Sequence, residues 1–167
     1  EPLELESLEG RMEPDTFVQM PPTLTNEIAK LRYMTDPLPE DVTIAGPVSA
    51  TIFASLDSED TNWIVTLKDL GPDYSDRTGR KGEWEVPELP EKYLTKGMLK
   101  ASMRELDEER STPYKPWHRL TEESQKPVVP GEINEYNIEI MSVCHTFRAG
   151  HRICVEISCL DLPDGAN

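Results

Sequence analysis

Short stretches in which apolar and polar residues alternate dominate the chain from residue 31 onward. The longest runs from Val48 to Leu56, where an apolar side chain occupies every second position. A period of two places successive side chains on opposite faces of a strand. This run therefore predicts a strand with one face in the core and the other in contact with solvent.

Other runs with the same period predict further strands, and turn-forming residues separate them. About seven short strands, with no long segment of helical period, predict an all-β fold in which two sheets pack as a sandwich. The runs lie around Leu31 and Tyr33, at Val42 to Ile44, at Asn62 to Leu70, at Leu99 to Met103 after Gly97, at Tyr136 to Ile140 and at Ile153 to Ile157, with turns at Gly46-Pro47, Asp57 to Asp60 and Pro130-Gly131.

Chain order predicts two strand pairings. Strands that follow one another commonly pair, so the strands on either side of Asp57 to Asp60 are expected to be antiparallel neighbours. The last two strands are expected to form a hairpin around Arg148-Ala149-Gly150. Within the first pair, Trp63 occupies an alternating position that predicts a place in the core.

The register of the final hairpin decides how the three cysteines lie, because residues paired across antiparallel strands share a face. If Ile140 and Ile157 both face the core, Cys144 and Cys159 face it too, opposite Ile153 and Ile138, and Cys154 points the other way. We therefore predict three free thiols, two of them buried as small hydrophobic groups. An odd number of cysteines does not suit a disulfide scaffold and favours a reducing, cytoplasmic location.

The length of 167 residues fits a single domain. Residues 1–30 mix acidic residues, prolines and scattered apolar residues and are expected to form a connecting arm, and residues 31–167 to form the β-sandwich domain. Two long interruptions, Gly71 to Lys96 and Glu105 to Val129, predict loops that carry a function or pack against another domain. Because the sequence begins at Glu1, we expect the natural N-terminus to lie elsewhere in a longer precursor.

The formal net charge of −15 argues against two classes of partner. Nucleic acids and anionic membranes both require clustered lysine and arginine, and no stretch approaches the run of about 20 apolar residues that a membrane-spanning helix needs. The acidic surface is expected to keep the protein in solution, and a cationic partner surface is the alternative.

A search for catalytic, metal or cofactor motifs predicts none. No serine lies in a Gly-x-Ser-x-Gly elbow, and no motif joins His118, His145 or His151 to a nucleophile. His145 and His151 flank the last turn and could share a metal, but zinc sites have denser spacings, so we expect side chains that bond backbone carbonyls there. Asp57 to Asp60 lacks the glycine and glutamate of an EF-hand and is expected to be a solvated hairpin turn. We predict no cofactor.

The segment from Ser111 to Arg119 combines prolines spaced by three with large aromatic residues. Such spacing favours an extended, low-entropy conformation, and buried aromatic residues dominate the energetics of many interfaces. Either these aromatic residues cover their own sandwich, or they are buried against a partner domain. The residues expected at an interdomain contact are Tyr114, Trp117, His118 and Trp84.

Several short segments, taken in order and with their spacing, resemble the C-terminal domain of the X-Pro dipeptidyl-peptidase and cocaine-esterase-like acyl hydrolases, the CocE/NonD family. They are Leu31 to Leu38, Glu40 to Val48, Asp60 to Trp63, Leu94 to Ser102, Pro130 to Ile133, Phe147 to Ile153, Ile157-Ser158 and Asp161 to Pro163.

The resemblance implies a jelly-roll β-sandwich of galactose-binding-like architecture. It also implies that the catalytic serine, aspartate and histidine belong to an α/β-hydrolase domain, of the same precursor or a separate chain, which the jelly roll covers and whose active-site cleft it helps to wall. None of the three maps onto this sequence. Two departures stand out: the chain stops at Asn167, so we expect a final edge strand to be lacking or replaced by another element, and Arg77, Arg80 and Lys81 mark Gly71 to Lys96 as a subgroup feature.

The leading hypothesis is therefore a non-catalytic accessory domain of a serine hydrolase acting on acyl esters or on N-terminal X-Pro dipeptides. A stand-alone carbohydrate- or ligand-binding jelly roll is the alternative, because fold does not fix function. An independent enzyme is a third, provided that another chain completes its site. Substrate and homo-oligomerisation stay open at this point.

Overall fold

The computed structural model describes residues 14–25, 27–72 and 91–161. The described chain is built from strands, and its helices are two single 3-10 turns, so the predicted all-β class is confirmed. The elements are β1 (Lys30–Met34), β2 (Val42–Ala54), β3 (Asn62–Leu70), β4 (Glu91–Lys100), η1 (Ala101–Met103), η2 (Glu122–Ser124), β5 (Asn134–Phe147) and β6 (Arg152–Ser158).

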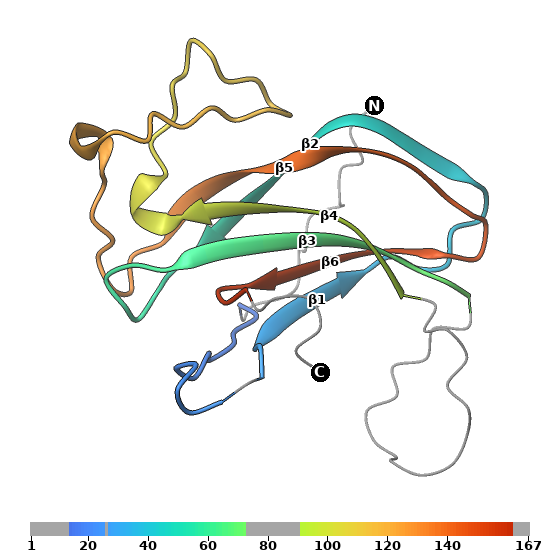
Figure 1. Cartoon of the computed structure of the whole chain (residues 1–167), viewed down its shortest axis with the longest axis horizontal. Coiled ribbons are helices and arrows are strands. Elements are labelled where there is room, and N and C mark those ends of the chain that lie inside the picture. The colour runs from blue at the N-terminus through green and yellow to red at the C-terminus, as the bar shows by residue number, and fades with distance from the viewer. Residues whose placement is uncertain (1–13, 26, 73–90, 162–167) are drawn as a thin grey trace.

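The strands form one antiparallel sheet in the order β1-β6-β3-β4-β5-β2, which curls strongly, as β5 and β2 pass over the other strands (Figure 1). The other neighbouring strands are joined by at least five residue pairs each. A single residue pair, Gly97 with Ile140, joins β4 to β5. The sheet therefore folds at this junction into a four-stranded part and a two-stranded part. Their facing sides enclose the core, as in a β-sandwich.

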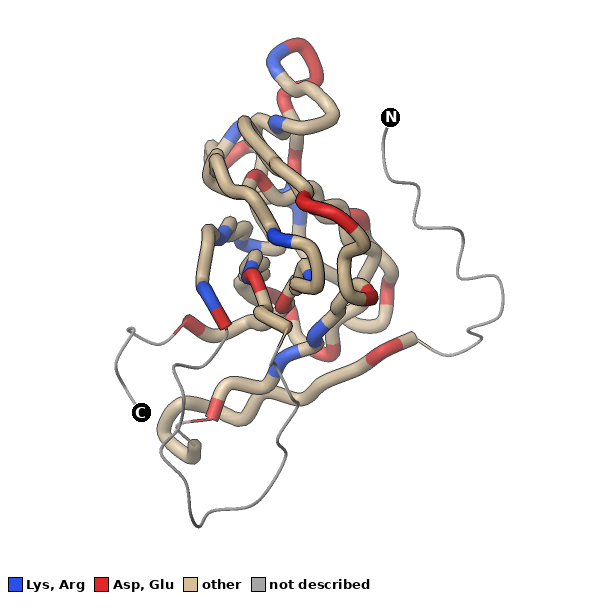
Figure 2. Tube along the Cα trace, turned by 90° about the vertical axis from the view of Figure 1, so that its right-hand side faces the viewer, with Lys and Arg blue, Asp and Glu red and all other residues tan. Residues whose placement is uncertain are grey.

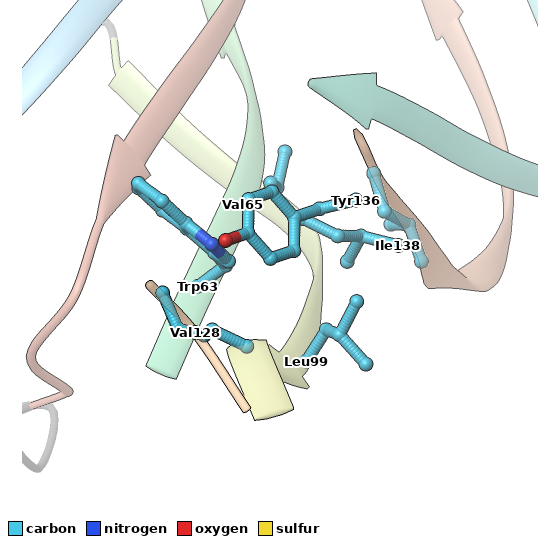
Figure 3. Close-up of a cluster of buried hydrophobic side chains, with 8 residues drawn as sticks. Trp63, Val65, Leu99, Val128, Tyr136 and Ile138 are labelled. Atoms are coloured by element: carbon cyan, nitrogen blue, oxygen red, sulfur yellow. The ribbon is translucent and has the colours of Figure 1, made fainter. Parts of the chain in front are cut away.

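The core is an aromatic pair surrounded by aliphatic side chains from both parts of the sheet. Trp63 of β3 is only 5% exposed, as its place in the alternating pattern predicts. Its ring packs against that of the fully buried Tyr136 of β5, with the ring centroids 5.5 Å apart (Figure 3). Val65 and Ile138 extend the cluster along the same strands. Each such side chain contributes about 1.5–3 kcal/mol when it is buried, so this cluster is the main apolar link between the two parts.

The junction between the two parts depends on the missing side chain of Gly97. A Cβ atom at this position would lie 2.1 Å from the main-chain oxygen of Glu139 and 2.9 Å from the Cα of Ile140. Contacts this short do not occur between such atoms, and both neighbours are main-chain atoms of β5, which cannot turn aside. Glycine is therefore required for β4 to approach β5 closely enough to fold the sheet.

The opposite face of the four-stranded part carries a cluster of alternating charges. Glu156 of β6 is buried and forms ion pairs with Arg32 of β1 and with Lys68 of β3, which also pairs with Glu91 of β4. Burial alone would raise the pKa of Glu156, but the hydrogen bond and charge of Lys68, with the nearby cations, outweigh it and lower this pKa. The cluster thus ties four neighbouring strands together through two carboxylates, Glu156 and Glu91.

The described part of the arm contacts the sheet directly. Phe17 packs against the core cluster, and Gln19 accepts a hydrogen bond from the main-chain N–H of Ala29 at 2.7 Å. These contacts hold the arm beside β1, at the edge of the sheet.

Both predicted pairings are wrong. β2 pairs with β5, and β3 pairs with β4 and β6, so the chain crosses between the two parts of the sheet after β2 instead of turning in a hairpin. β5 and β6 likewise lie in different parts of the sheet. The expected turn at Gly46-Pro47 is a break in register inside β2, which continues from Val42 to Ala54.

The predicted arrangement of the cysteines holds only in part. All three thiols are free, as predicted, and Cys154 points away from the core, but it is fully buried on the other face of the sheet, and Cys144 is exposed instead of facing the core. Cys154 pairs in register with Lys68 and Met34, on the face that carries the charge cluster. Burial raises the pKa of the Cys154 thiol, which keeps it protonated and unreactive.

Two local predictions also need correction. The weak strand expected at Leu99 to Met103 is the end of β4 followed by η1. Asp60 does not belong to a solvated hairpin turn, since its carboxylate accepts hydrogen bonds from the N–H and the hydroxyl of Ser102 in η1, at 3.0 and 2.7 Å. It therefore fixes the point at which the chain leaves β4.

We expect Gly97→Ala to destabilise the fold by about 3 kcal/mol or more, because the added methyl group must push β4 away from β5. Equilibrium unfolding in urea measures this loss. Gly131→Ala is the matched control: its φ of +83° makes any side chain strained, but no atom lies within 4 Å of the added Cβ. A loss for Gly97→Ala no larger than that of the control would show that the close approach does not limit the fold.

Candidate docking loop and buried polar cluster

The connection from Glu105 to Leu120, here called the docking loop, is a small irregular hairpin that projects from the sheet (Figure 1). The N–H of Asp107 donates to the carbonyl of Trp117 at 2.7 Å, and Thr112 and Lys115 exchange main-chain hydrogen bonds of 3.1 Å around the tip. The extended conformation predicted for Ser111 to Arg119 is therefore folded back on itself. Paired backbone groups give this loop a defined shape despite its length.

Side chains fasten the docking loop to the sheet at its tip and at its base. At the tip, the Ser49 hydroxyl of β2 donates to the carbonyl of Pro113 at 2.9 Å. At the base, Arg104 donates to the carbonyls of Lys126 and Pro127, at 2.6 and 3.2 Å, and so joins the two ends of the connection. The loop consequently lies over the outer face of β2 and β5.

The docking loop presents large apolar side chains to solvent. Tyr114 at the tip is 57% exposed, Trp117 is 37% exposed and Leu120 is 67% exposed. The guanidinium of Arg110 lies 3.9 Å from the centroid of the Trp117 ring, a cation–π contact that holds the indole in place. Acidic and basic positions sit side by side at the outer end of this loop (Figure 2).

His118, on the returning arm of the loop, is the residue that turns inward. Its Nε2 is buried and has no hydrogen-bond partner among the described residues, and the ring lies beside the main chain of Asn137 on β5. Burial lowers the pKa of His118, against the smaller raising effects of the Asn137 main chain and of the nearby Glu139 carboxylate. His118 therefore favours its neutral form in the folded protein.

Leu120, where the loop ends, has a φ of +46°. An L-residue in this left-handed region costs about 1–2 kcal/mol, because its Cβ approaches the following carbonyl. The capping box of η2 follows immediately: the Thr121 hydroxyl accepts from the N–H of Ser124 at 3.2 Å, and the Ser124 hydroxyl accepts from the N–H of Thr121 at 3.0 Å. The strained residue thus lies between the exposed loop and a fixed turn.

The structure brings His145 and His151 together, as considered from the sequence, but a third residue joins them. Asp69 of β3 is buried, and its two carboxylate oxygens accept from different rings: His145 Nε2 at 2.7 Å and His151 Nδ1 at 2.7 Å. The expectation that these rings bond backbone carbonyls is wrong. This polar cluster links β3, β5 and the β5–β6 turn at one end of the core.

Asp69 was missed from the sequence, although a signal for it exists. Trp63, Val65, Leu67 and Asp69 alternate along β3, so the aspartate occupies a position whose predecessors all face the core. A carboxylate at such a position needs buried partners. Among residues 14–25, 27–72 and 91–161, no group of three or more histidine, cysteine, aspartate or glutamate side chains is arranged to hold a metal ion.

The four predicted contact residues have different positions. Tyr114 and Trp117 share the exposed surface of the docking loop, and His118 anchors the loop from beneath. Trp84 lies outside the described residues. No helix in the described ranges is long and apolar enough to cross a membrane.

We expect Asp69→Asn to lower the free energy of unfolding by about 2 kcal/mol or more, because an amide cannot accept from both rings without burying an unpaired N–H group. Thermal unfolding followed by circular dichroism measures the change. Asp41→Asn is the control. It removes an exposed ion pair with Arg148, which lies in the same β5–β6 turn as His151, and it should change stability much less. Equal effects of the two substitutions would contradict a specific role of the buried cluster.

Known proteins match this chain over most of its length. Residues 8–165 match the family model described as the X-Pro dipeptidyl-peptidase C-terminal non-catalytic domain. Two proteins named as serine esterases, from Mycobacterium bovis and Mycobacterium tuberculosis, are 29% identical over 134 residues, which are 78% of this chain and 19% of theirs. The chain thus spans about a fifth of the length of these relatives.

Solved structures support the fold. A CocE/NonD family hydrolase from Staphylococcus aureus superposes with a TM-score of 0.66 at 21% identity, over 82% of this chain and 24% of that one. An aminopeptidase from a marine sediment archaeon, Thaumarchaeota archaeon, gives a TM-score of 0.57 at 30% identity, over 80% and 18% of the two chains. The matched family model, the relatives and the fold agree: this chain belongs to the family of X-Pro dipeptidyl-peptidase C-terminal non-catalytic domains.

Proposed function

We propose that this domain serves a serine hydrolase acting on acyl esters or N-terminal X-Pro dipeptides, and that it packs on the α/β-hydrolase domain and walls the active-site cleft. The relatives named as serine esterases support the reaction class, and their much greater length leaves room for a catalytic domain. The reacting groups then belong to that domain, and this one supplies a shaped surface.

The observation that carries the proposal is the exposed aromatic surface of the docking loop. Trp117 and Tyr114 are large side chains that gain most from burial at an interface, and the hairpin and the Arg110 contact reduce the entropy lost on docking. Single exposed apolar residues are common on proteins, but a structured loop that presents several of them is typical of an interface. We assign this loop to the contact with the catalytic domain.

The alternative, a stand-alone carbohydrate-binding module, receives less support. Such modules bind sugars on aromatic side chains that line a cleft. A shallow depression beside η1 is lined by Glu59, Asp60, Ser102, Gln125, Pro127, Val128, Val129 and Pro130, with no aromatic residue among them.

We expect this polypeptide alone to hydrolyse neither p-nitrophenyl esters nor Gly-Pro-p-nitroanilide, and to resist a serine-directed fluorophosphonate probe. Release of p-nitrophenol or p-nitroaniline and in-gel fluorescence give the two readouts, with a serine esterase as positive control. Turnover together with labelling would show that the chain contains its own nucleophile, and the accessory role would be abandoned.

In the parent hydrolase, we expect Trp117→Ala to lower the midpoint of thermal inactivation. A tryptophan that is buried as an interface hot spot typically contributes about 2 kcal/mol or more to the stability of the interface. In this chain alone the same substitution should cost about 1 kcal/mol or less. Tyr93→Ala is the matched control, since Tyr93 is 46% exposed but lies near the start of β4, far along the sheet from the docking loop (Figure 1). Equal effects of Trp117→Ala and Tyr93→Ala on the parent enzyme would remove the docking role.

A further inference from the structure

We propose that His118 is a proton-sensitive latch: in its neutral form it fastens the docking loop to β5, and its protonation releases the loop. The release itself concerns this domain alone, whereas its consequence, weaker docking at acidic pH, rests on the proposed function. His118 is thus a positioning residue for the loop and not a catalytic one.

The first step of the argument is the place of His118 in the loop. Its main chain forms a bridge with Leu106, between the hydrogen bonds that join Asp107 to Trp117 and Arg119 to Glu105. The side chain is partly buried, with its Nε2 out of contact with solvent, and the main chain of Asn137 on β5 lies beside the ring. His118 therefore lies at the centre of the paired part of the loop, next to the exposed Trp117.

The second step concerns the two nitrogen atoms of the ring. A neutral imidazole that donates through one nitrogen leaves the other as an acceptor, and a buried acceptor without a partner is tolerated more readily than a buried donor. Protonation turns the buried Nε2 into a charged donor with no acceptor among the described residues. The docked loop must then either keep an unpaired charge in the interior or move away and let water reach the ring.

The charged groups around His118 do not remove this penalty. Glu139 of β5 favours the protonated form, but its effect is smaller than that of burial. On the facing arm of the loop, the Glu105 carboxylate is shared between Arg119 and Lys126. Asp107 lies on the same arm, where its main-chain N–H bonds Trp117. Burial therefore decides the direction of the shift.

The sign of the pH dependence follows from linkage. The pKa of His118 is lowered in the docked loop and returns to about 6.5 when the loop is released. The docked form is fully favoured above the pKa of the released form, and the preference is lost as the pH falls through it toward the docked pKa. Each unit of difference between the two values changes the ratio of docked to released loop about tenfold. The left-handed Leu120 adds to this tendency, because release lets its backbone relax.

Amide hydrogen exchange measured by NMR on this 167-residue chain tests the latch. We expect the protection factors of the Asp107 and Arg119 amides, both bonded within the loop, to fall between about pH 7.5 and about pH 5.5, a range that spans the ordinary histidine pKa. The amide of Val65, in the centre of β3, should keep its protection factor over the same range. Protection factors, unlike raw rates, are corrected for the intrinsic effect of pH on exchange.

His118→Asn is the decisive variant, because its amide is polar and cannot titrate in this range. We expect it to abolish the pH response of the Asp107 and Arg119 amides, and His118→Gln, a second variant that cannot titrate, to do the same should the first fail to fold. His145 and His151 are present in all three proteins, so the difference isolates His118. Unchanged loop protection in the wild-type protein, or an equal fall in a folded variant, would overturn the latch.

This experiment and the test of docking fail independently. The exchange measurement contains no catalytic domain, so a negative result removes the latch and leaves the role of Trp117 in docking intact. Equal inactivation of the Trp117→Ala and Tyr93→Ala enzymes removes docking and leaves the exchange result unaffected. If both proposals hold, the parent hydrolase should lose thermal stability at about pH 5.5 more than its His118→Asn variant does.

Discussion

The close approach of β4 to β5 at Gly97 is the constraint on which the rest of the structure depends. One residue pair joins the two parts of the sheet. A longer row of paired residues would hold β4 and β5 side by side, whereas a single pair lets the sheet fold at this point. Folding brings β3 over β5 and places Trp63 against Tyr136. Hydrophobic burial drives this closure, but the missing side chain at position 97 permits it. A single steric requirement thus determines where the core forms.

The same junction determines where the docking loop emerges. β4 ends three residues after Gly97, and Asp60 holds the following turn through Ser102. Arg104 then closes the base of the long connection, so the loop must cross the outer face of β2 and β5. Its aromatic residues project from a position that the core has already fixed. The surface available to a partner is in this sense a consequence of core geometry, although no core residue takes part in it.

The sequence predicts local structure far better than pairing. Alternation identified β3 with its correct ends and the core position of Trp63, because the period of two is a property of neighbouring residues. Pairing is not local: Ile140 meets Gly97, and Val155 meets Leu67, across long stretches of chain. Chain order suggested hairpins instead, and the exposed Cys144 was placed on the core face. Asp69, which joins His145 to His151, could not be identified before the strands that carry them were placed.

The buried Asp69 cluster and the docking loop differ in how far their polar groups are satisfied. This difference indicates which of the two is available for function. Asp69 has a donor for each of its oxygens, so a ligand would have to break satisfied, buried hydrogen bonds to use it. The docking loop is different: it exposes Trp117, strains Leu120 and leaves Nε2 of His118 without a partner among the described residues. Unsatisfied groups and strain cost stability, and they persist where another interaction compensates for them. The polar cluster is therefore part of the framework, and the loop is the surface that we propose for contact with another molecule.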